Sequence, residues 1–186
     1  FDARSALHRD VFVGMLDRLL PPAPPWDASP VGPVAQLAIF VHRVEGLAPG
    51  LYFYARDRVV AAAMRAAMRP EFVWEPVTDR LSLLVPIPCG PAAQRLSCDQ
   101  DIAADGFFSL AMLVPLADTL ASEGEHAYRR LFWDCGMVGQ GLYLEAEAAG
   151  ARGTGIGCFF DDPVCELLGL EGPTFQSLYH FSMGAP

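Results

Sequence analysis

The sequence predicts an α+β fold in which helices flank a central, mostly antiparallel sheet. Hydrophobic residues make up 52% of the 186 residues and charged residues 19%, as in a chain that folds around a packed core. Segments with apolar residues at helical spacing are mixed with short apolar runs typical of strands. The length suits one domain rather than two, so we expect a single domain over residues 1–186. Because the chain starts without Met and stops directly after a strand-like run, we expect this domain to lack its native terminal segments.

The expected elements fall into two sets. Apolar residues three or four positions apart predict helices at 7–20, 59–68, 92–104 and 126–149. Runs of apolar and β-branched residues predict strands at 36–44, 51–54, 107–114, 153–160 and 175–183. The prolines after residue 20 end the first helix and begin a rigid connector over residues 21–34. Residues 70–90 hold four prolines and match neither pattern.

The strongest helix prediction is 126–149. Its apolar stripe consists of Leu131, Cys135, Val138, Leu142, Ala146 and Ala149. Gly136, Gly139 and Gly141 lie inside this helix, and each costs it about 1 kcal/mol relative to alanine. We therefore expect another helix, a second subunit or a flat ligand to approach the backbone there.

Residues 153–157 form a Gly-Thr-Gly-Ile-Gly motif. A dinucleotide-binding loop follows a strand and opens a helix, whereas this motif follows a long helix and leads into a strand. Two interpretations remain: a plain turn, or a bare backbone that a ligand ring or phosphate can approach. A short helix follows, with Asp161 or Asp162 as its N-cap, Pro163 in its first turn and Gly169 at its end.

The charge distribution excludes several classes of function. Thirteen basic residues, all arginine, stand against 22 acidic ones, which gives a net charge of −9 and argues against a nucleic-acid partner. Without lysine, the chain has neither a Schiff base nor a P-loop lysine. Its longest apolar run, residues 107–117, is shorter than the roughly 18 to 20 residues that span a bilayer, so we expect no membrane partner.

The cysteines predict core thiols in a reducing cytoplasm. No two of them form a C-x-x-C pair, which argues against a zinc knuckle and a disulfide framework: Cys89, Cys98, Cys135, Cys158 and Cys165. The four histidines likewise lack metal-ligand spacing, so no metal site is expected. A nucleophilic pair of Cys165 with His180 stays open as an alternative.

The C-terminal third resembles the nitroreductase superfamily, and most closely the branch of the SagB/ThcOx-type dehydrogenases. The resemblance is carried by the runs Tyr128–Trp133, Gly139–Gln140, Tyr143–Gly150, Thr154–Asp162, Leu167–Leu170 and Leu178–Phe181. Upstream, Phe1–Ala3 and the stretch from Gly46 to Tyr52 fit the same pattern.

This resemblance implies a nitroreductase-like fold and an FMN-dependent oxidoreductase. It implies a homodimer with flavin bound between the subunits, and hydride transfer through flavin N5 to or from a small organic or peptide-derived substrate. NAD(P)H is an expected electron donor. By the family pattern, the cofactor-binding residues are Gly155, Ile156, Gly157 and Cys158, with the last two supplying backbone N–H groups to the flavin. No catalytic side chain is implied, since flavin carries the chemistry.

Two departures from the family pattern motivate an alternative. Arg4-Ser5 looks like part of the phosphate-binding signature but follows Phe1-Asp2 instead of preceding it. The loop expected to contact the flavin ring, within residues 21–34, contains Ser29 but no asparagine. The alternative is a catalytically silent flavin fold that serves as a dimerisation or peptide-recognition module.

Overall fold

The computed structural model describes residues 1–21, 26–28 and 32–186. Its strands are β1 (Leu7–His8), β2 (Gln36–Val41), β3 (Val44–Glu45), β4 (Gly50–Tyr54), β5 (Glu75–Pro76), β6 (Leu81–Val85), β7 (Phe108–Pro115), β8 (Arg152–Ile156) and β9 (Phe175–Gly184). Its helices are α1 (Arg9–Asp17), α2 (Arg58–Ala67), α3 (Gly90–Leu96), α4 (Ile102–Asp105), α5 (Leu116–Glu123), α6 (Ala127–Ala148) and α7 (Asp161–Leu168), with a 3-10 turn at Trp26–Ala28.

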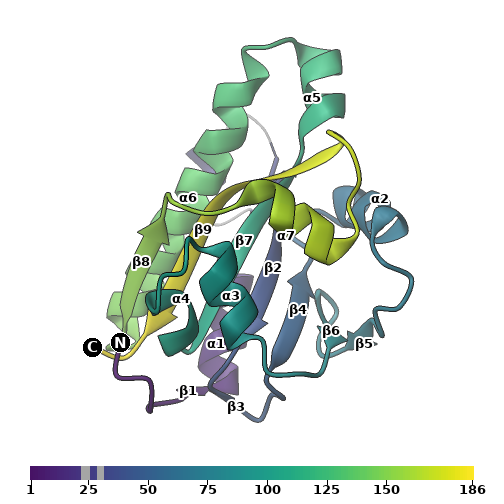
Figure 1. Cartoon of the computed structure of the whole chain (residues 1–186). Coiled ribbons are helices and arrows are strands. Elements are labelled where there is room, and N and C mark those ends of the chain that lie inside the picture. Colours follow the sequence, from purple (N-terminus) through teal and green to yellow (C-terminus); the bar gives the residue numbers. More distant parts are fainter. Residues whose placement is uncertain (22–25, 29–31) are drawn as a thin grey trace.

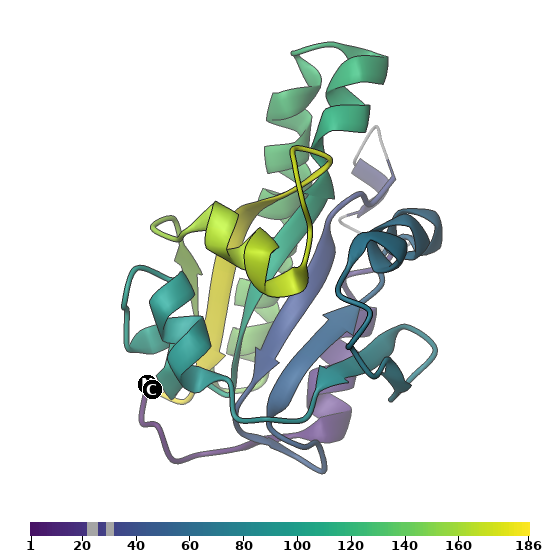
Figure 2. The same ribbon diagram turned by 45° about the vertical axis from the view of Figure 1, so that its right-hand side comes forward.

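The centre of the molecule is one antiparallel sheet with the strand order β5-β6-β4-β2-β7-β9-β8. Helices α1 and α6 cover one face, and α3, α4 and α7 cover the other, with α2 beside them (Figures 1 and 2). Both ends of the chain meet at one corner of the sheet, where the Asp2 N–H donates to the Ala185 carbonyl at 3.2 Å. The predicted α+β class and the helix-flanked antiparallel sheet are confirmed.

The core has two halves because successive side chains of a strand point to opposite faces. In β2, Leu37, Ile39 and Val41 pack with α1 and α6, whereas Ala38 and Phe40 pack with the helices on the other face. All six residues of this strand are buried. The sheet is therefore covered on both sides along its middle, while β8 forms one of its edges.

Helix α6 confirms the strongest helix prediction. Five of its six stripe residues are buried, from Leu131 to Ala146, and Ala149 just beyond the helix is exposed.

A buried ion pair joins this helix to the connection between β4 and α2: Arg56 Nη1 lies 3.0 Å from Asp134 Oδ2, with side chains 0% and 3% exposed. Asp134 Oδ2 also accepts the N–H groups of Val34 and Ala35, which fixes the entry into β2.

The structure corrects several expected boundaries. The helix expected at 92–104 is two helices, α3 and α4, because Cys98 and Asp99 adopt left-handed backbone angles with φ of 55° and 56°. The unassigned stretch 70–90 contains β5 and β6, and α5 was not expected. Strand β8 ends at Ile156, so residues 157–160 form a turn.

The short helix α7 was correctly expected, but its cap was not. The N-cap position is Phe160, and Asp161 is the first helical residue instead of an N-cap. Gly169 ends the helix as predicted, with a left-handed φ of 77°. Half of the connector at 21–34, including Ser29, lies outside the described residues. Within the described ranges, no helix is both long and apolar enough to cross a bilayer.

Candidate functional site

The turn between β8 and α7 contains the two sequence-predicted residues that remain accessible. Gly157 and Cys158 are both exposed. A Cβ atom added to Gly157 would meet no atom of the described residues within 4 Å. The backbone N–H groups of Gly157 and Cys158 also have no hydrogen-bond partner in residues 1–21, 26–28 and 32–186. The turn thus presents two donors, unpaired within the described part of the chain, on a backbone that a flat molecule can approach.

The other two predicted residues, Gly155 and Ile156, are engaged inside the chain. The Gly155 N–H donates to Tyr143 Oη at 2.7 Å, and a Cβ on Gly155 would clash with the Tyr179 hydroxyl. Ile156 is 2% exposed and is the last β8 residue paired with β9, opposite His180. These two residues therefore position the turn, whereas Gly157 and Cys158 present it to solvent.

The helix glycines do not share one explanation, contrary to expectation. A Cβ on Gly139 would lie 2.9 Å from Tyr179 Cε1, and one on Gly141 would lie 3.0 Å from Leu19 Cδ2. Both glycines thus make room for side chains of the same chain. Gly136 has no described neighbour within 4 Å of such an atom, which leaves it alone open to a partner.

A disulfide between Cys98 and Cys158 corrects the expectation of five free thiols. The two Cα atoms are 5.9 Å apart, and the bridge ties the α3–α4 connection to the turn. Gln100 Nε2 donates to the Cys158 carbonyl at 3.1 Å, and the Phe160 N–H donates to the Leu96 carbonyl at 2.9 Å. Cys89, Cys135 and Cys165 are free and buried, as predicted for core thiols.

His180 lies beneath the turn in a buried polar pocket. Its ring stacks on Phe159 with centroids 4.3 Å apart, and its nitrogens lie 3.4 Å from Ser97 Oγ and 3.2 Å from Ser177 Oγ. Burial lowers the pKa of His180 to about 3, so the ring is neutral at physiological pH. Cys165 donates instead to the Phe175 carbonyl, 3.6 Å away, and burial raises the pKa of its thiol. The structure therefore gives no support to a Cys165–His180 nucleophile pair.

The outer face of α6 carries large exposed apolar side chains. Trp133 is 60% exposed and Leu144 is 59% exposed, and both lie on the face that contains Gly136. Eleven residues are close to three helical turns, so Trp133 and Leu144 align along the helix. Exposed apolar side chains that align in this way are typical of a protein–protein contact.

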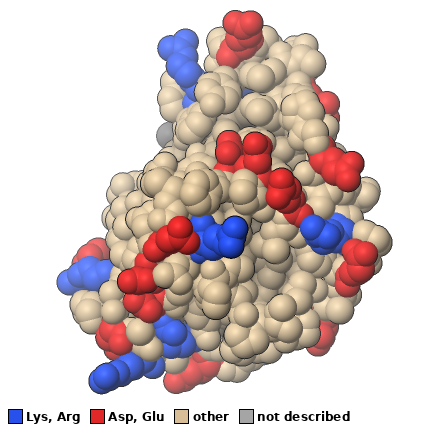
Figure 3. All heavy atoms as spheres, in the orientation of Figure 1, with Lys and Arg blue, Asp and Glu red and all other residues tan. Residues whose placement is uncertain are grey.

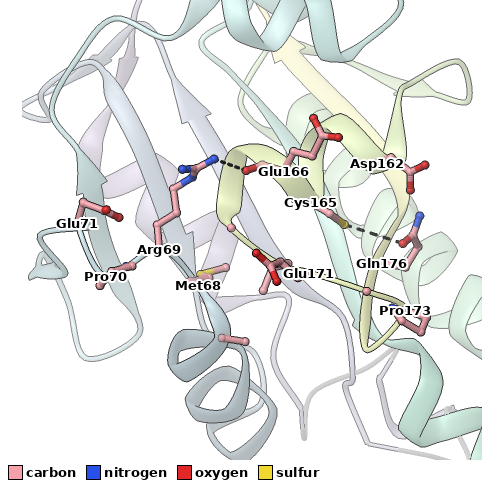
Figure 4. A pocket seen from close by; sticks show the side chains of 14 residues that line it. Met68, Arg69, Pro70, Glu71, Asp162, Cys165, Glu166, Glu171, Pro173 and Gln176 are labelled. Atoms are coloured by element: carbon pink, nitrogen blue, oxygen red, sulfur yellow. Dashed lines mark hydrogen bonds between the residues drawn. The ribbon is translucent and has the colours of Figure 1, made fainter.

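A separate hollow of about 1110 Å³ opens between the ends of α2 and α7 (Figure 4). Arg69 points across it and donates from Nε to the Leu167 carbonyl at 2.8 Å and from Nη2 to the Glu166 carbonyl at 2.6 Å. This arginine therefore caps the C-terminal end of α7. The other charged lining residues are all acidic: Glu71, Asp162, Glu166 and Glu171. None of the four sequence-predicted site residues lines this hollow.

The surface charges are scattered. On the face in Figure 3, the arginine side chains of the described residues lie apart from one another, several of them beside acidic side chains. No group of three or more His, Cys, Asp and Glu side chains within the described ranges is placed to hold a metal ion.

Comparison with known proteins places the chain in a family. The model of the nitroreductase family matches residues 60–185, so the chain belongs to the nitroreductase family. The same region contains α6, the β8–α7 turn and the exposed α6 face. The comparison with curated proteins gave no match.

Solved structures share the fold. A nitroreductase of Anabaena variabilis ATCC 29413 is 25% identical with a TM-score of 0.75, covering 98% of this chain and 34% of that one. The Escherichia coli microcin synthetase McbBCD complex, with truncated pro-MccB17 bound, contains a chain 17% identical with a TM-score of 0.71, covering 100% and 66%. An oxidoreductase containing FMN is 17% identical with a TM-score of 0.54, covering 100% and 70%. This chain thus spans about a third of the first protein and slightly less than two thirds of the second.

Proposed function

We propose that this chain is a single-domain FMN-dependent oxidoreductase that moves hydride through flavin N5 to or from a small organic or peptide-derived substrate. The observation that carries the proposal is the turn at Gly157 and Cys158, where two N–H donors have no partner among the described residues and the backbone is exposed. Flavin presents ring nitrogens and carbonyl oxygens as acceptors, so the donor set of the turn fits it. Membership of the nitroreductase family supports an oxidoreductase.

The chain's own residues would hold and orient the ring. Gly157 leaves space for a flat group, and the N–H groups of Gly157 and Cys158 would donate to it. Gly155 and Ile156 would position the turn, because their contacts with Tyr143 and strand β9 fix the end of β8. Bound FMN would supply the hydride chemistry, which no titratable side chain of the turn could supply alone.

We also propose a homodimer and a place in the SagB-type dehydrogenase branch. The exposed stripe of Trp133 and Leu144 on α6, beside the open Gly136, supports a dimer contact. Similarity in fold to a chain of the microcin synthetase complex, whose structure contains a propeptide, supports a peptide substrate. In the reductase direction, NAD(P)H would be the electron donor. We also propose a cytoplasmic location, in which the three buried thiols would stay reduced and the Cys98–Cys158 bridge would be open to reduction.

The test is FMN binding by the wild type and by Gly157→Val. We expect the wild type to bind about one FMN per chain with a visible flavin band. The variant should bind at least tenfold more weakly, because the valine side chain fills the approach to both amides. Its circular dichroism and melting temperature should stay close to wild type, since nothing described lies within 4 Å of the new Cβ. Gly90→Val is the matched control, with Ala104 Cβ at an ordinary 3.6 Å, and it should keep FMN.

The outcomes separate the candidate functions. Full FMN binding by Gly157→Val would contradict the proposed site. Bleaching of the flavin band by NAD(P)H would support the reductase direction, and bleaching by dithionite alone would favour the dehydrogenase branch. A wild type that fails to bind added FMN would contradict the oxidoreductase and favour the dimerisation or peptide-recognition module.

A further inference from the structure

The Cys98–Cys158 bridge joins the most irregular part of the backbone to the turn. Cys98 and Asp99 are consecutive residues with φ of 55° and 56°, a left-handed conformation that residues other than glycine seldom adopt. Such backbone persists only where surrounding contacts hold it. Here the contacts are the bridge and the hydrogen bonds of Gln100 to the Ser97 and Cys158 carbonyls, at 2.7 and 3.1 Å.

The bridge is accessible, while the other thiols are not. Cys158 is an exposed residue and Cys98 is partly exposed. The three free cysteines are buried, and burial raises the pKa of the Cys89 thiol to about 12 and also raises those of Cys135 and Cys165. Thiolate is the reactive form, so these three thiols would stay silent at neutral pH. A thiol reagent at neutral pH would therefore act on the bridge.

We propose that Cys98–Cys158 is a reversible redox bridge, reduced by a dithiol, that controls the order of the turn at residues 157–160. Disulfides in a reducing compartment are mostly transient and redox-sensing, and exposed ones are the labile class. Reduction would remove the covalent link between the turn and the α3–α4 connection, leaving it tied by the Gln100 and Phe160 hydrogen bonds. The left-handed pair at Cys98 and Asp99 could then relax.

The chemistry balances as a two-electron exchange. One thiolate of the dithiol attacks the sulfur of Cys158, the more exposed of the two residues, and the bond to Cys98 Sγ breaks as Cys98 leaves as a thiolate. The second thiol of the reagent then attacks its own sulfur in the mixed disulfide and releases Cys158. The dithiol loses two electrons and two protons and becomes a cyclic disulfide, and the bridge gains both as two thiols.

The consequence for function rests on the proposed flavin site. The bridge holds Cys158, whose N–H is one of the two proposed flavin donors. Oxidised protein would present these donors in a fixed arrangement, and reduced protein would have to order the turn on binding. The redox state would therefore set how tightly the chain holds FMN.

The first experiment reads the bridge without flavin. The native full chain is treated with dithiothreitol, alkylated with iodoacetamide and mapped by peptide mass spectrometry. We expect two newly alkylated residues, Cys98 and Cys158. In a separate reduced sample that is not alkylated, oxidised glutathione should restore the bridge. Hydrogen exchange at the hydrogen-bonded amides of Ser97, Gln100 and Phe160 should be at least tenfold faster in the reduced form. The Cys98→Ala/Cys158→Ala double variant should exchange like reduced wild type, and Cys165→Ala should respond like wild type.

Two results would overturn the proposal: failure of Cys98 and Cys158 to become alkylated as a pair, or equal exchange of the Phe160 amide in both redox forms. FMN titration is the second readout, with a dissociation constant expected to be at least fivefold higher in the reduced form. Equal FMN affinity in both forms would overturn the control of binding by the bridge. Failure of both forms to bind FMN would contradict the proposed function instead, while alkylation and exchange would still decide the bridge.

Discussion

At the scale of single residues, His180 shows how a polar side chain is accommodated under the candidate site. It is 2% exposed, has Ser97 and Ser177 hydroxyls at its two nitrogens, and stacks on Phe159. A neutral ring can use both hydroxyls, whereas a charged ring would lose its hydration, and the attraction to Asp161 is too small to offset that loss. The site beneath the turn therefore favours the uncharged form.

This preference predicts acid sensitivity. The pKa of His180 falls from 6.5 to about 3 on folding, so between these pH values the unfolded chain binds a proton that the folded chain does not. Stability from this group is complete above pH 6.5 and is lost as the pH falls, by about 1.4 kcal/mol per pH unit. Urea unfolding at pH 6.5 and pH 4.5 gives the free energy of unfolding that each protein loses on acidification. This loss should be about 2 to 3 kcal/mol smaller in His180→Gln than in wild type. An identical loss in both proteins would contradict this account of the histidine.

At the scale of elements, the Arg56–Asp134 pair joins segments that are distant in sequence. Arg56 follows β4, Asp134 belongs to α6, and the N–H groups of Val34 and Ala35 before β2 share the same carboxylate. Arg56 also lies over the Trp26 ring, 4.8 Å from its centroid. One buried charge therefore fixes the relative positions of a helix, a strand entry and a loop.

Removing one member of this pair should unfold the protein more easily. Asp134→Ala leaves the Arg56 guanidinium buried and unpaired, and we expect it to lower the free energy of unfolding by about 3 to 5 kcal/mol. Asp79→Ala is the control, because it breaks an ion pair with Arg58 in which the two side chains are 69% and 65% exposed. That change should cost less than about 1 kcal/mol. The free energy of unfolding of each variant is measured by urea unfolding. Equal losses of this free energy in Asp134→Ala and Asp79→Ala would contradict the expected effect of burying the pair.

How far the sequence predicts these elements depends on whether the signal is local. The stripe of α6 is a repeating pattern within one segment, and Gly169 is a local stop, so both were predicted. The break between α3 and α4 was missed, since neither Cys98 nor Asp99 is a glycine that announces a left-handed turn. The roles of Gly139 and Gly155 depend on Tyr179, which is distant in sequence, so spacing alone could not assign them. For the candidate turn, the sequence named the segment, but only the packing separates Gly157 and Cys158 from Gly155 and Ile156.

At the scale of the whole molecule, the sheet is well covered but its outer helix is not. Helix α6 buries one stripe against the sheet and leaves a second apolar stripe in solvent, which includes Phe132 and Trp133. Strand β8 is an edge strand of the sheet, and the turn at Gly157 follows it directly. A second copy of the chain packed on α6 would bury the apolar stripe, and the close approach of its backbone would explain the bare Gly136.

The dimer proposal predicts that charge on this stripe separates the subunits. Trp133→Glu places a carboxylate where the proposed contact excludes water, and burying an unpaired charge is costly. Light scattering should show wild type with twice the mass of the chain and the variant with its single mass. Because the family resemblance implies a flavin site between two subunits, we expect the variant also to bind FMN more weakly, with its circular dichroism unchanged. Val59→Glu is the control, since Val59 is 80% exposed on α2, and it should keep both the dimer and FMN. A wild-type monomer that binds FMN would contradict a site shared between subunits. A Trp133→Glu variant that remains dimeric would show that the subunits do not pack on the α6 stripe.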